Sequence, residues 1–234
     1  MAVLQWVHAI GRGMLDLLYP PRCAGCGRVG VLYCPSCRHA VLLVKPPLCP
    51  LCGQPQATPG RCARCERDPL RIDGIRSVAL FEGSLRRAIH SFKYEYARDL
   101  ALPLGEMLVA FWQETPLPAD AIVPVPLHRR RLRERGYNQA ALLAGRLGQA
   151  TGVPVLYGAL SRRRYTVSQT QLAADQRRRN VEGAFVCVGS QVRGRRALLI
   201  DDVCTTGATL EASSVALQEG GARSVWALTL ARAH

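Results

Sequence analysis

The sequence predicts an α/β protein in which helices cover both faces of a mostly parallel sheet, preceded by a small cysteine-rich domain. Two observations favour this fold class. After residue 70, short apolar segments alternate with segments of helical periodicity. Before residue 70, eight of the ten cysteines form four C-x-x-C pairs. We therefore expect two domains in this chain of 234 residues, 1–70 and 71–234.

The expected elements follow one another in a regular order. Residues 3–19 have the pattern of a short amphipathic helix ahead of Pro20 and Pro21. Further helices are expected at 84–113 (as one or two helices, with Pro103 able to start the second), 138–152 and 208–220. Strands are expected at 77–83, 121–126, 153–158, 183–188, 195–202 and 223–232. In a parallel sheet of this kind, ligands bind beyond the carboxyl ends of the strands.

The four C-x-x-C pairs predict two structural zinc sites. Each pair presents two thiolates from one tight turn, and four thiolates at about 2.3 Å close a tetrahedral site. A disulfide framework needs an oxidising compartment, and a redox C-x-x-C pair would occur singly. Neighbouring pairs close the shortest loops, although an interleaved pairing stays open. The expected ligands are Cys23, Cys26, Cys34, Cys37, Cys49, Cys52, Cys62 and Cys65.

The charge of the chain is strongly positive and unevenly distributed. The formal net charge is +14, and residues 127–196 contain fifteen arginines and three acidic residues. Such a concentration attracts phosphate, nucleic acid or acidic proteins. A coding bias toward arginine explains the preference for Arg over Lys, but it does not explain the clustering. The segment therefore favours a polyanion-binding surface.

Location in the cell is predicted from two absent patterns. The N-terminus lacks the basic and apolar regions of a signal peptide. No run of about 20 apolar residues, the length that crosses a bilayer, occurs in the sequence. The sequence therefore predicts a cytoplasmic protein without a membrane span.

The stretch "ALLIDDVCTTGATL" (197–210) predicts the binding site. Its apolar part reads as a buried parallel strand, so the two adjacent carboxylates must emerge at the rim of the core. The following helix begins with unpaired amides, which together with hydroxyl groups and a glycine form a cup for a dianionic phosphate. This pattern predicts a phosphorylated sugar as ligand, with its hydroxyls or a Mg²⁺ ion at the acids. The expected contact residues are Asp201, Asp202, Thr205, Thr206, Gly207, Ala208 and Thr209.

This arrangement resembles the signature of the type I phosphoribosyltransferases, which bind 5-phosphoribosyl-1-pyrophosphate. The resemblance implies a type I phosphoribosyltransferase-like sheet and Mg²⁺ bound with the sugar pyrophosphate. It also implies that Asp201 and Asp202 contact the ribose hydroxyls, as the catalytic pair if the domain is active, and that the next loop wraps the 5′-phosphate. By analogy with glutamine amidophosphoribosyltransferases, residues 124–130 would form the pyrophosphate loop, with Pro126 and Arg129 at the ligand. Residues 163–180 would form the flexible loop that closes over bound substrate.

Two further stretches, "SFKYEYARDLA" and "VPVPLHRRRLRERGYNQAALLA", resemble the ComF family of bacterial proteins. With the cysteine-rich front, this resemblance runs over nearly the whole chain. Lys93 lies in the shared "FKY" stretch and is expected to contact the pyrophosphate or an acceptor.

The family resemblance implies a role in natural competence, namely the handling of incoming single-stranded DNA beside a DNA-uptake helicase and a recombination mediator. Arginines would bind DNA phosphates weakly and without sequence preference, because few aromatic residues accompany them. The expected contacts are Arg130, Arg131, Arg163, Arg164 and Arg178. The alternative function is an active transferase that moves ribose 5-phosphate from phosphoribosyl pyrophosphate to an unidentified acceptor.

Overall fold

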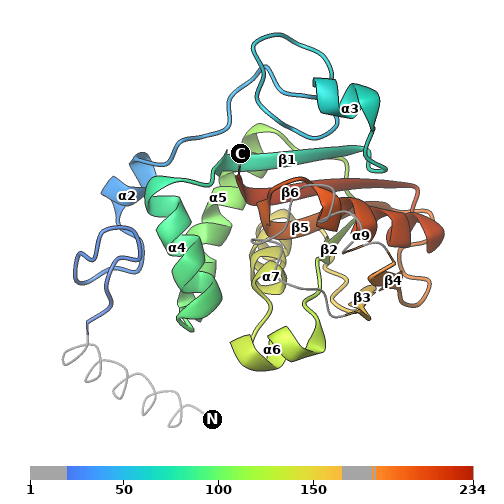
Figure 1. Ribbon diagram of the computed structural model, residues 1–234. Helices are drawn as coiled ribbons and strands as arrows, with labels where there is room; N and C mark the ends of the chain where they lie inside the picture. The colour runs from blue at the N-terminus through green and yellow to red at the C-terminus, as the bar shows by residue number, and fades with distance from the viewer. Residues whose placement is uncertain (1–19, 165–180, 182, 234) are drawn as a thin grey trace.

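The computed structural model describes residues 20–164, 181 and 183–233 (Figure 1). The helix expected at 3–19 and most of the expected flexible loop lie outside these residues. The helices are α2 (Pro35–His39), α3 (Ala63–Arg67), α4 (Gly83–Tyr94), α5 (Ala101–Glu114), α6 (Arg129–Arg135), α7 (Gln139–Thr151) and α9 (Ala208–Glu219), with a 3-10 turn η1 (Arg98–Leu100). The strands are β1 (Gly74–Leu80), β2 (Ala121–Pro124), β3 (Leu160–Arg162), β4 (Phe185–Cys187), β5 (Arg196–Cys204) and β6 (Ser224–Arg232).

The main sheet is parallel and has the strand order β1-β6-β5-β2. Its two central strands, β5 and β6, place alternate side chains on opposite faces. Leu198 and Leu228 are buried against α4, α5 and α7, whereas Leu199 and Ala227 are buried with α9. The central strands are therefore covered on both sides, which explains why they read as continuous apolar runs. The predicted fold class, a parallel sheet between two helical layers, is confirmed (Figure 1).

Two local expectations were wrong, and one strand was not expected. Residues 153–158 form no regular strand: Val155 makes a single parallel bridge to Ile122 at the sheet edge, and Tyr157 is 61% exposed. The segment 124–130 is not all loop, because α6 begins at Arg129. The strand expected at 183–188 is present as β4, and it pairs antiparallel with the unexpected strand β3 in a separate two-stranded sheet.

The physical reasons for these differences are plain. A short apolar stretch beside an edge strand satisfies its polar backbone with only a few bonds, here Ile122 N–H to Pro154 O and Leu156 N–H to Ile122 O. Strand β3 lies within a polar stretch, so its side chains do not predict a strand. Its pairing with β4 uses main-chain groups, which the side-chain pattern does not reveal.

The two cysteine groups pack at separate places on the sheet domain. Cys34 and Cys37 belong to the core that contains α4, and the Ser84 hydroxyl donates to the Cys37 carbonyl at 2.8 Å. Cys49 and Cys65 belong instead to the core on the α9 side of the sheet. Figure 1 accordingly places α2 beside α4, and α3 above β1. The described part of residues 1–70 thus shares its cores with the sheet, and the boundary at residue 70 stays a prediction.

Among the helices of the described residues, none has the length and apolarity that crossing a membrane requires.

Candidate functional site

The eight paired cysteines form two groups of four. Within each group all sulfur atoms lie within 4.8 Å of one another. The Sγ atoms of Cys26 and Cys34 are 3.7 Å apart, and so are those of Cys52 and Cys62. Four sulfurs at about 2.3 Å from a tetrahedral ion lie about 3.8 Å apart, so the residues fit zinc. The groups are Cys23, Cys26, Cys34 and Cys37 (the first zinc centre) and Cys49, Cys52, Cys62 and Cys65 (the second zinc centre), which confirms the pairing of neighbours.

A pocket of about 340 Å³ opens at the carboxyl ends of the parallel strands. The lining includes residues that follow β1, β2 and β6 in the chain, namely Phe81, Pro126 and Ala233. It also includes the two acids of β5. The position agrees with the rule for open α/β sheets. The charged side chains of the lining are four cations and two acids: Lys93, Arg131, Arg135, Arg162, Asp201 and Asp202. This excess of positive charge suits an anionic ligand.

Asp201 and Asp202 have different partners. The Asp202 carboxylate accepts from Lys93 Nζ at 2.7 Å, and Asp202 is 6% exposed. The Asp201 carboxylate accepts from the Asp202 backbone N–H at 2.8 Å. Burial and then the charge of Asp202 raise the pKa of Asp201 to about 7, although Lys93 and Arg162 act in the opposite direction. At neutral pH the pair therefore carries less than its full negative charge.

Asp201 and Asp202 lie within strand β5, which continues two residues beyond the expected end at residue 202. Val203 and Cys204 still pair with Ala231 and Arg232 of β6. Cys204 is buried, and burial raises the pKa of its thiol.

The loop after β5 differs from its expected arrangement in three residues. Thr205 and Thr209 line the pocket, whereas Thr206, Gly207 and Ala208 do not. The Thr206 hydroxyl accepts from the Ala208 N–H at 3.4 Å. Gly207 has a φ of +82° at the N-cap of α9, where an added Cβ would lie 3.2 Å from Leu70 Cδ1. The positive φ and the close packing of Ile75 and Leu70 each favour glycine at this position.

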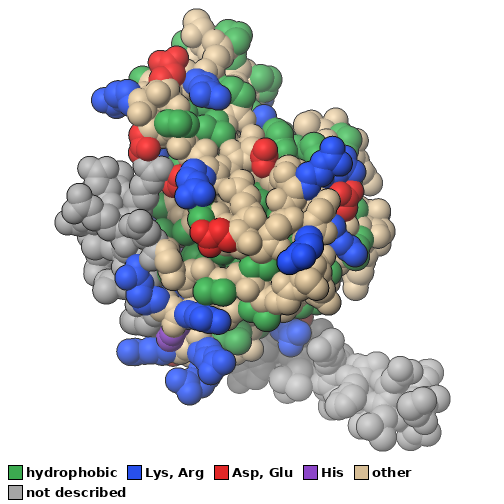
Figure 2. Space-filling view, turned by 90° about the vertical axis from the view of Figure 1, so that its right-hand side faces the viewer, with side chains coloured by type: hydrophobic (Ala, Val, Ile, Leu, Met, Phe, Trp, Pro, Cys, Tyr) green, Lys and Arg blue, Asp and Glu red, His purple; other side chains and the backbone are tan. Residues whose placement is uncertain are grey.

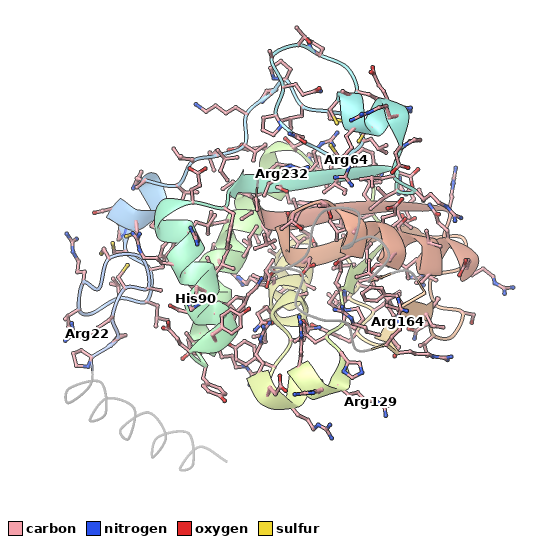
Figure 3. The ribbon with its side chains drawn as sticks, in the orientation of Figure 1. Arg22, Arg64, His90, Arg129, Arg164 and Arg232 are labelled. Carbon is pink, nitrogen blue, oxygen red and sulfur yellow. The ribbon has the colours of Figure 1, made fainter. Side chains whose placement is uncertain are left out.

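The expected basic residues are divided between the pocket and the outer surface. Lys93 lines the pocket, as expected. Arg131, which was expected to contact DNA, also lines the pocket. Arg129 is exposed on α6 and is not in the lining (Figure 3). Arg130 pairs with Glu134 at 2.9 Å. Arg163 and Arg164 are exposed after β3, and Arg178 lies outside the described residues.

Sequence reasoning missed Arg162. Its guanidinium lines the pocket and lies 5.2 Å from the centroid of the Phe185 ring on β4. Burial and the positive charge of Arg131 lower the pKa of Arg162, while Asp201 raises it. The sequence does not distinguish Arg162 as a pocket residue, because it is the first of three consecutive arginines.

The stretch "GYNQ" (136–139) was also missed as a support of the site. The Phe92 carbonyl, at the end of α4, accepts from the Tyr137 hydroxyl at 2.7 Å and from Gln139 Nε2 at 3.1 Å. Asn138 Nδ2 donates to the Val125 carbonyl at 3.0 Å. These bonds fix the residue before Lys93 and the loop after β2. A signal existed, because polar side chains at the start of an amphipathic helix are often held by backbone groups.

The second zinc centre contacts the loop that follows β5. Arg64 lies between two of its cysteines on α3 and donates to the Thr206 carbonyl at 2.7 Å. Arg232, which is buried, donates to the Cys52 carbonyl at 2.6 Å and to Cys204 Sγ at 3.5 Å. Figure 3 shows both arginines at the upper edge of the sheet. The Arg64 side chain thus ties the zinc-binding segment to the loop, and the Arg232 side chain of β6 joins Cys52 to Cys204 at the end of β5.

The pocket residues also fit a magnesium ion bound with a phosphate ligand. Mg²⁺ prefers one or two carboxylates together with phosphate oxygens. Asp201 and Asp202 supply adjacent carboxylates in the lining, and Lys93 balances the charge of Asp202. This donor set matches that preference.

Comparison with known proteins finds relatives named as competence proteins and as DNA utilization proteins. A family model described as a double zinc ribbon domain matches residues 14–66. The chain is 34% identical to the DNA utilization protein YhgH of Salmonella typhi, over 83% of this chain and 88% of the relative. It is 31% identical to competence protein ComFC of Bacillus subtilis, over 85% and 83%. It is also 31% identical to competence protein F of Haemophilus influenzae, over 95% of both chains.

Solved structures with a similar arrangement include phosphoribosyl-handling enzymes. One is glutamine phosphoribosylpyrophosphate amidotransferase from B. subtilis, with 28% identity, a TM-score of 0.38, and coverage of 55% of this chain and 25% of that chain. Another is adenine phosphoribosyl transferase from Trypanosoma brucei, with 14% identity, a TM-score of 0.37, and coverage of 60% and 67%. On the identity and coverage of the sequence relatives, this zinc-ribbon α/β protein belongs to the ComF family.

Proposed function

We propose that this protein binds phosphoribosyl pyrophosphate with Mg²⁺ in the pocket and handles single-stranded DNA during uptake, in the cytoplasm. The observation that carries the first part is the joint placement of two acids, two threonines and four cations in one pocket at the strand ends. The names of the relatives, competence protein and DNA utilization protein, support the second part. The partners would be a DNA-uptake helicase and a recombination mediator, as the family resemblance implies.

Each part of the ligand meets a different part of the pocket in this proposal. The 5′-phosphate lies by Thr205 and Thr209 at the N-terminal end of α9, where the helix dipole favours an anion. Asp201 and Asp202 hold the ribose hydroxyls and Mg²⁺, which neutralises part of the pyrophosphate charge. The pyrophosphate lies by the cations of the lining. Because each of these groups is charged or polar, binding is expected to weaken with salt.

Titration calorimetry over a pH series tests the sugar-pyrophosphate part. Mg²⁺ and the ribose hydroxyls favour an ionised acid, so affinity should rise by about tenfold between pH 6 and pH 8 as Asp201, with a pKa of about 7, loses its proton. In Asp201→Asn, affinity should be weak and should depend much less on pH, leaving only the ionisation of the ligand itself. No binding heat with wild-type protein and Mg²⁺ at pH 8 would end the proposal.

Stability should change with pH in the opposite direction. The folded-state pKa of Asp201 is raised, so between about pH 4 and pH 7 the native state binds more protons than the unfolded state. The free energy of unfolding therefore falls as the pH rises through this window, and Asp201→Asn should remove that part of the dependence. Opposite trends in affinity and stability are the signature of this carboxyl group.

The DNA part predicts a salt-dependent affinity. Helix α6 carries five arginines and one acid, and Arg129 and Arg133 are exposed. If three to five phosphates are neutralised, the plot of log affinity against log salt for oligothymidine has a slope of about −2 to −4. In the double variant Arg129→Gln/Arg133→Gln, this slope should be less negative by about one to two units. A slope near zero for the wild type, measured by fluorescence anisotropy, is incompatible with the proposal.

A further inference from the structure

Two tyrosines at the mouth of the pocket and beside it have an unusual exposure. Tyr94 at the end of α4 is 58% exposed, and Tyr96 is 73% exposed. Tyr96 is also the one residue other than glycine with a positive φ, +54°, in the part of the chain that the structure describes. A bulky residue adopts this backbone conformation at a cost, and such residues gather at functional sites. An exposed ring that is kept at a backbone cost suggests a ligand for the ring.

These tyrosines lie against the basic helix α6. The Tyr96 hydroxyl donates to the Glu134 carbonyl at 3.3 Å. The Arg135 guanidinium lies 5.2 Å from the centroid of the Tyr94 ring. Basic side chains gather at the lower end of the face in Figure 2, the end at which Figure 1 places α6. Rings from one segment and cations from another thus form a single surface. We call Tyr94, Tyr96, Arg131 and Arg135 the tyrosine–arginine surface.

This surface is continuous with the mouth of the pocket. Tyr94, Arg131 and Arg135 also line the pocket, whereas Tyr96 lies outside the lining. A small sugar phosphate fills the interior and has no flat apolar group for an exposed ring. A nucleobase has such a group, and its neighbouring phosphates attract arginines. Bases in a duplex hide their faces in the stack, so the chemistry of the surface favours an unpaired strand.

We propose that the tyrosine–arginine surface binds single-stranded DNA, with a base stacked on Tyr96 and the backbone phosphates by Arg131 and Arg135. This inference rests on the DNA-handling part of the proposed function and gives it a place on the molecule.

The arginine-rich segment 127–196 itself contains four aromatic residues, Tyr137, Tyr157, Tyr165 and Phe185. Tyr137 is buried, and Phe185 is buried beside Arg162. Tyr157 is exposed but lies in a groove between α5 and α7, and Tyr165 lies outside the described residues. We therefore assign the stacking contact to Tyr96.

The test compares two exposed tyrosines. Tyr96→Ala is expected to weaken binding of a fluorescent oligothymidine by about tenfold or more, since one stacked base is lost. Tyr96→Phe keeps the ring and should bind within about threefold of wild type. The matched control is Tyr157→Ala, since Tyr157 is 61% exposed and away from α6. It should bind as wild type does. A duplex of the same length should show no difference between Tyr96→Ala and wild type.

Zinc content and melting temperature, compared among the variants, establish that each one is folded. If wild type binds oligothymidine and Tyr96→Ala binds as well as Tyr157→Ala, the surface is wrong but the DNA function stands. If wild type binds no single strand, the DNA function and this surface are both wrong. Equal losses for single strand and duplex in Tyr96→Ala would contradict base stacking.

Discussion

Loss of the second zinc centre is expected to abolish ligand binding, whereas loss of the first should leave most of it. Arg64 joins the second centre to the Thr206 carbonyl, and Gly207 packs against Leu70, which follows the last cysteine. The first centre instead packs against α4 through Cys37 and Ser84. Structural zinc contributes about 10 kcal/mol or more to the folding of small zinc modules, which is comparable with the whole stability of a domain. Without its ion, the second segment can no longer hold the loop.

The variants Cys65→Ser and Cys34→Ser test this difference. Both cysteines are buried, at 0% and 1% exposure, so the substitutions are matched. Each should lower the zinc content, measured by elemental analysis, from about two ions to about one. Cys65→Ser should also lose binding of phosphoribosyl pyrophosphate and increase hydrogen exchange at residues 204–209. Equal affinities in the two variants would contradict the link between the second centre and the loop.

Substitution of Arg64 tests the contact with the loop while the zinc ligands stay in place. Arg64→Ala keeps all cysteines but removes the bond to Thr206, which should weaken ligand binding by about two- to tenfold, as expected for one hydrogen bond of about 0.5–1.5 kcal/mol. Arg67→Ala is the control, since Arg67 lies on the same helix, is exposed, and donates to Ala63 within that helix. Faster hydrogen exchange in the loop of Arg64→Ala, with zinc content unchanged, would support the positioning role independently of ligand.

The double substitution Asp201→Asn/Asp202→Asn is expected to lower the affinity for phosphoribosyl pyrophosphate by about a hundredfold or more, because charge-assisted bonds of about 1.5–3 kcal/mol each are lost. The change also leaves Lys93 without the carboxylate that its ammonium contacts at 2.7 Å. Asparagine is nearly isosteric with aspartate, so the pocket should keep its shape. Calorimetry with Mg²⁺ at pH 8 measures the loss.

Asp120→Asn is the matched control for these acids. Asp120 precedes β2 at the opposite end of the sheet and pairs with Arg196 Nη2 at 2.6 Å. The substitution removes one carboxylate from the same sheet without touching the pocket. Affinity in Asp120→Asn should therefore equal that of wild type. A comparable loss in this variant would mean that the double substitution acts through general destabilisation and not through the ligand.

Much of the fold was predictable because its signals are local. Four C-x-x-C pairs identified all eight zinc ligands, since two thiolates of one tight turn point to the same ion. The apolar runs of β5 and β6 identified central strands, since both faces of these strands are buried. The failures lie at the edges: residues 153–158 and 160–162 depend on which neighbour supplies a main-chain partner, and side-chain pattern does not encode that.

The candidate site was predictable in part for the same reason. Asp201, Asp202, Thr205 and Thr209 lie within one strand–turn–helix, so their common position follows from chain connectivity. The role of Thr206 and Gly207 was not visible, because it depends on Arg64 and Leu70 from a distant segment.

The sequence by itself determined the zinc ligands, the central strands and the acidic pair, because residues close in the chain are placed by local geometry alone. Only the tertiary structure decided which charges meet. Packing of α4 against the main sheet brings Lys93 to Asp202, and the separate sheet of β3 and β4 places Arg162 at the same pocket. The Tyr96 hydroxyl meets α6 at the Glu134 carbonyl. Such contacts join segments whose separation in the chain carries no information about their distance, and packing of the two cores fixes them.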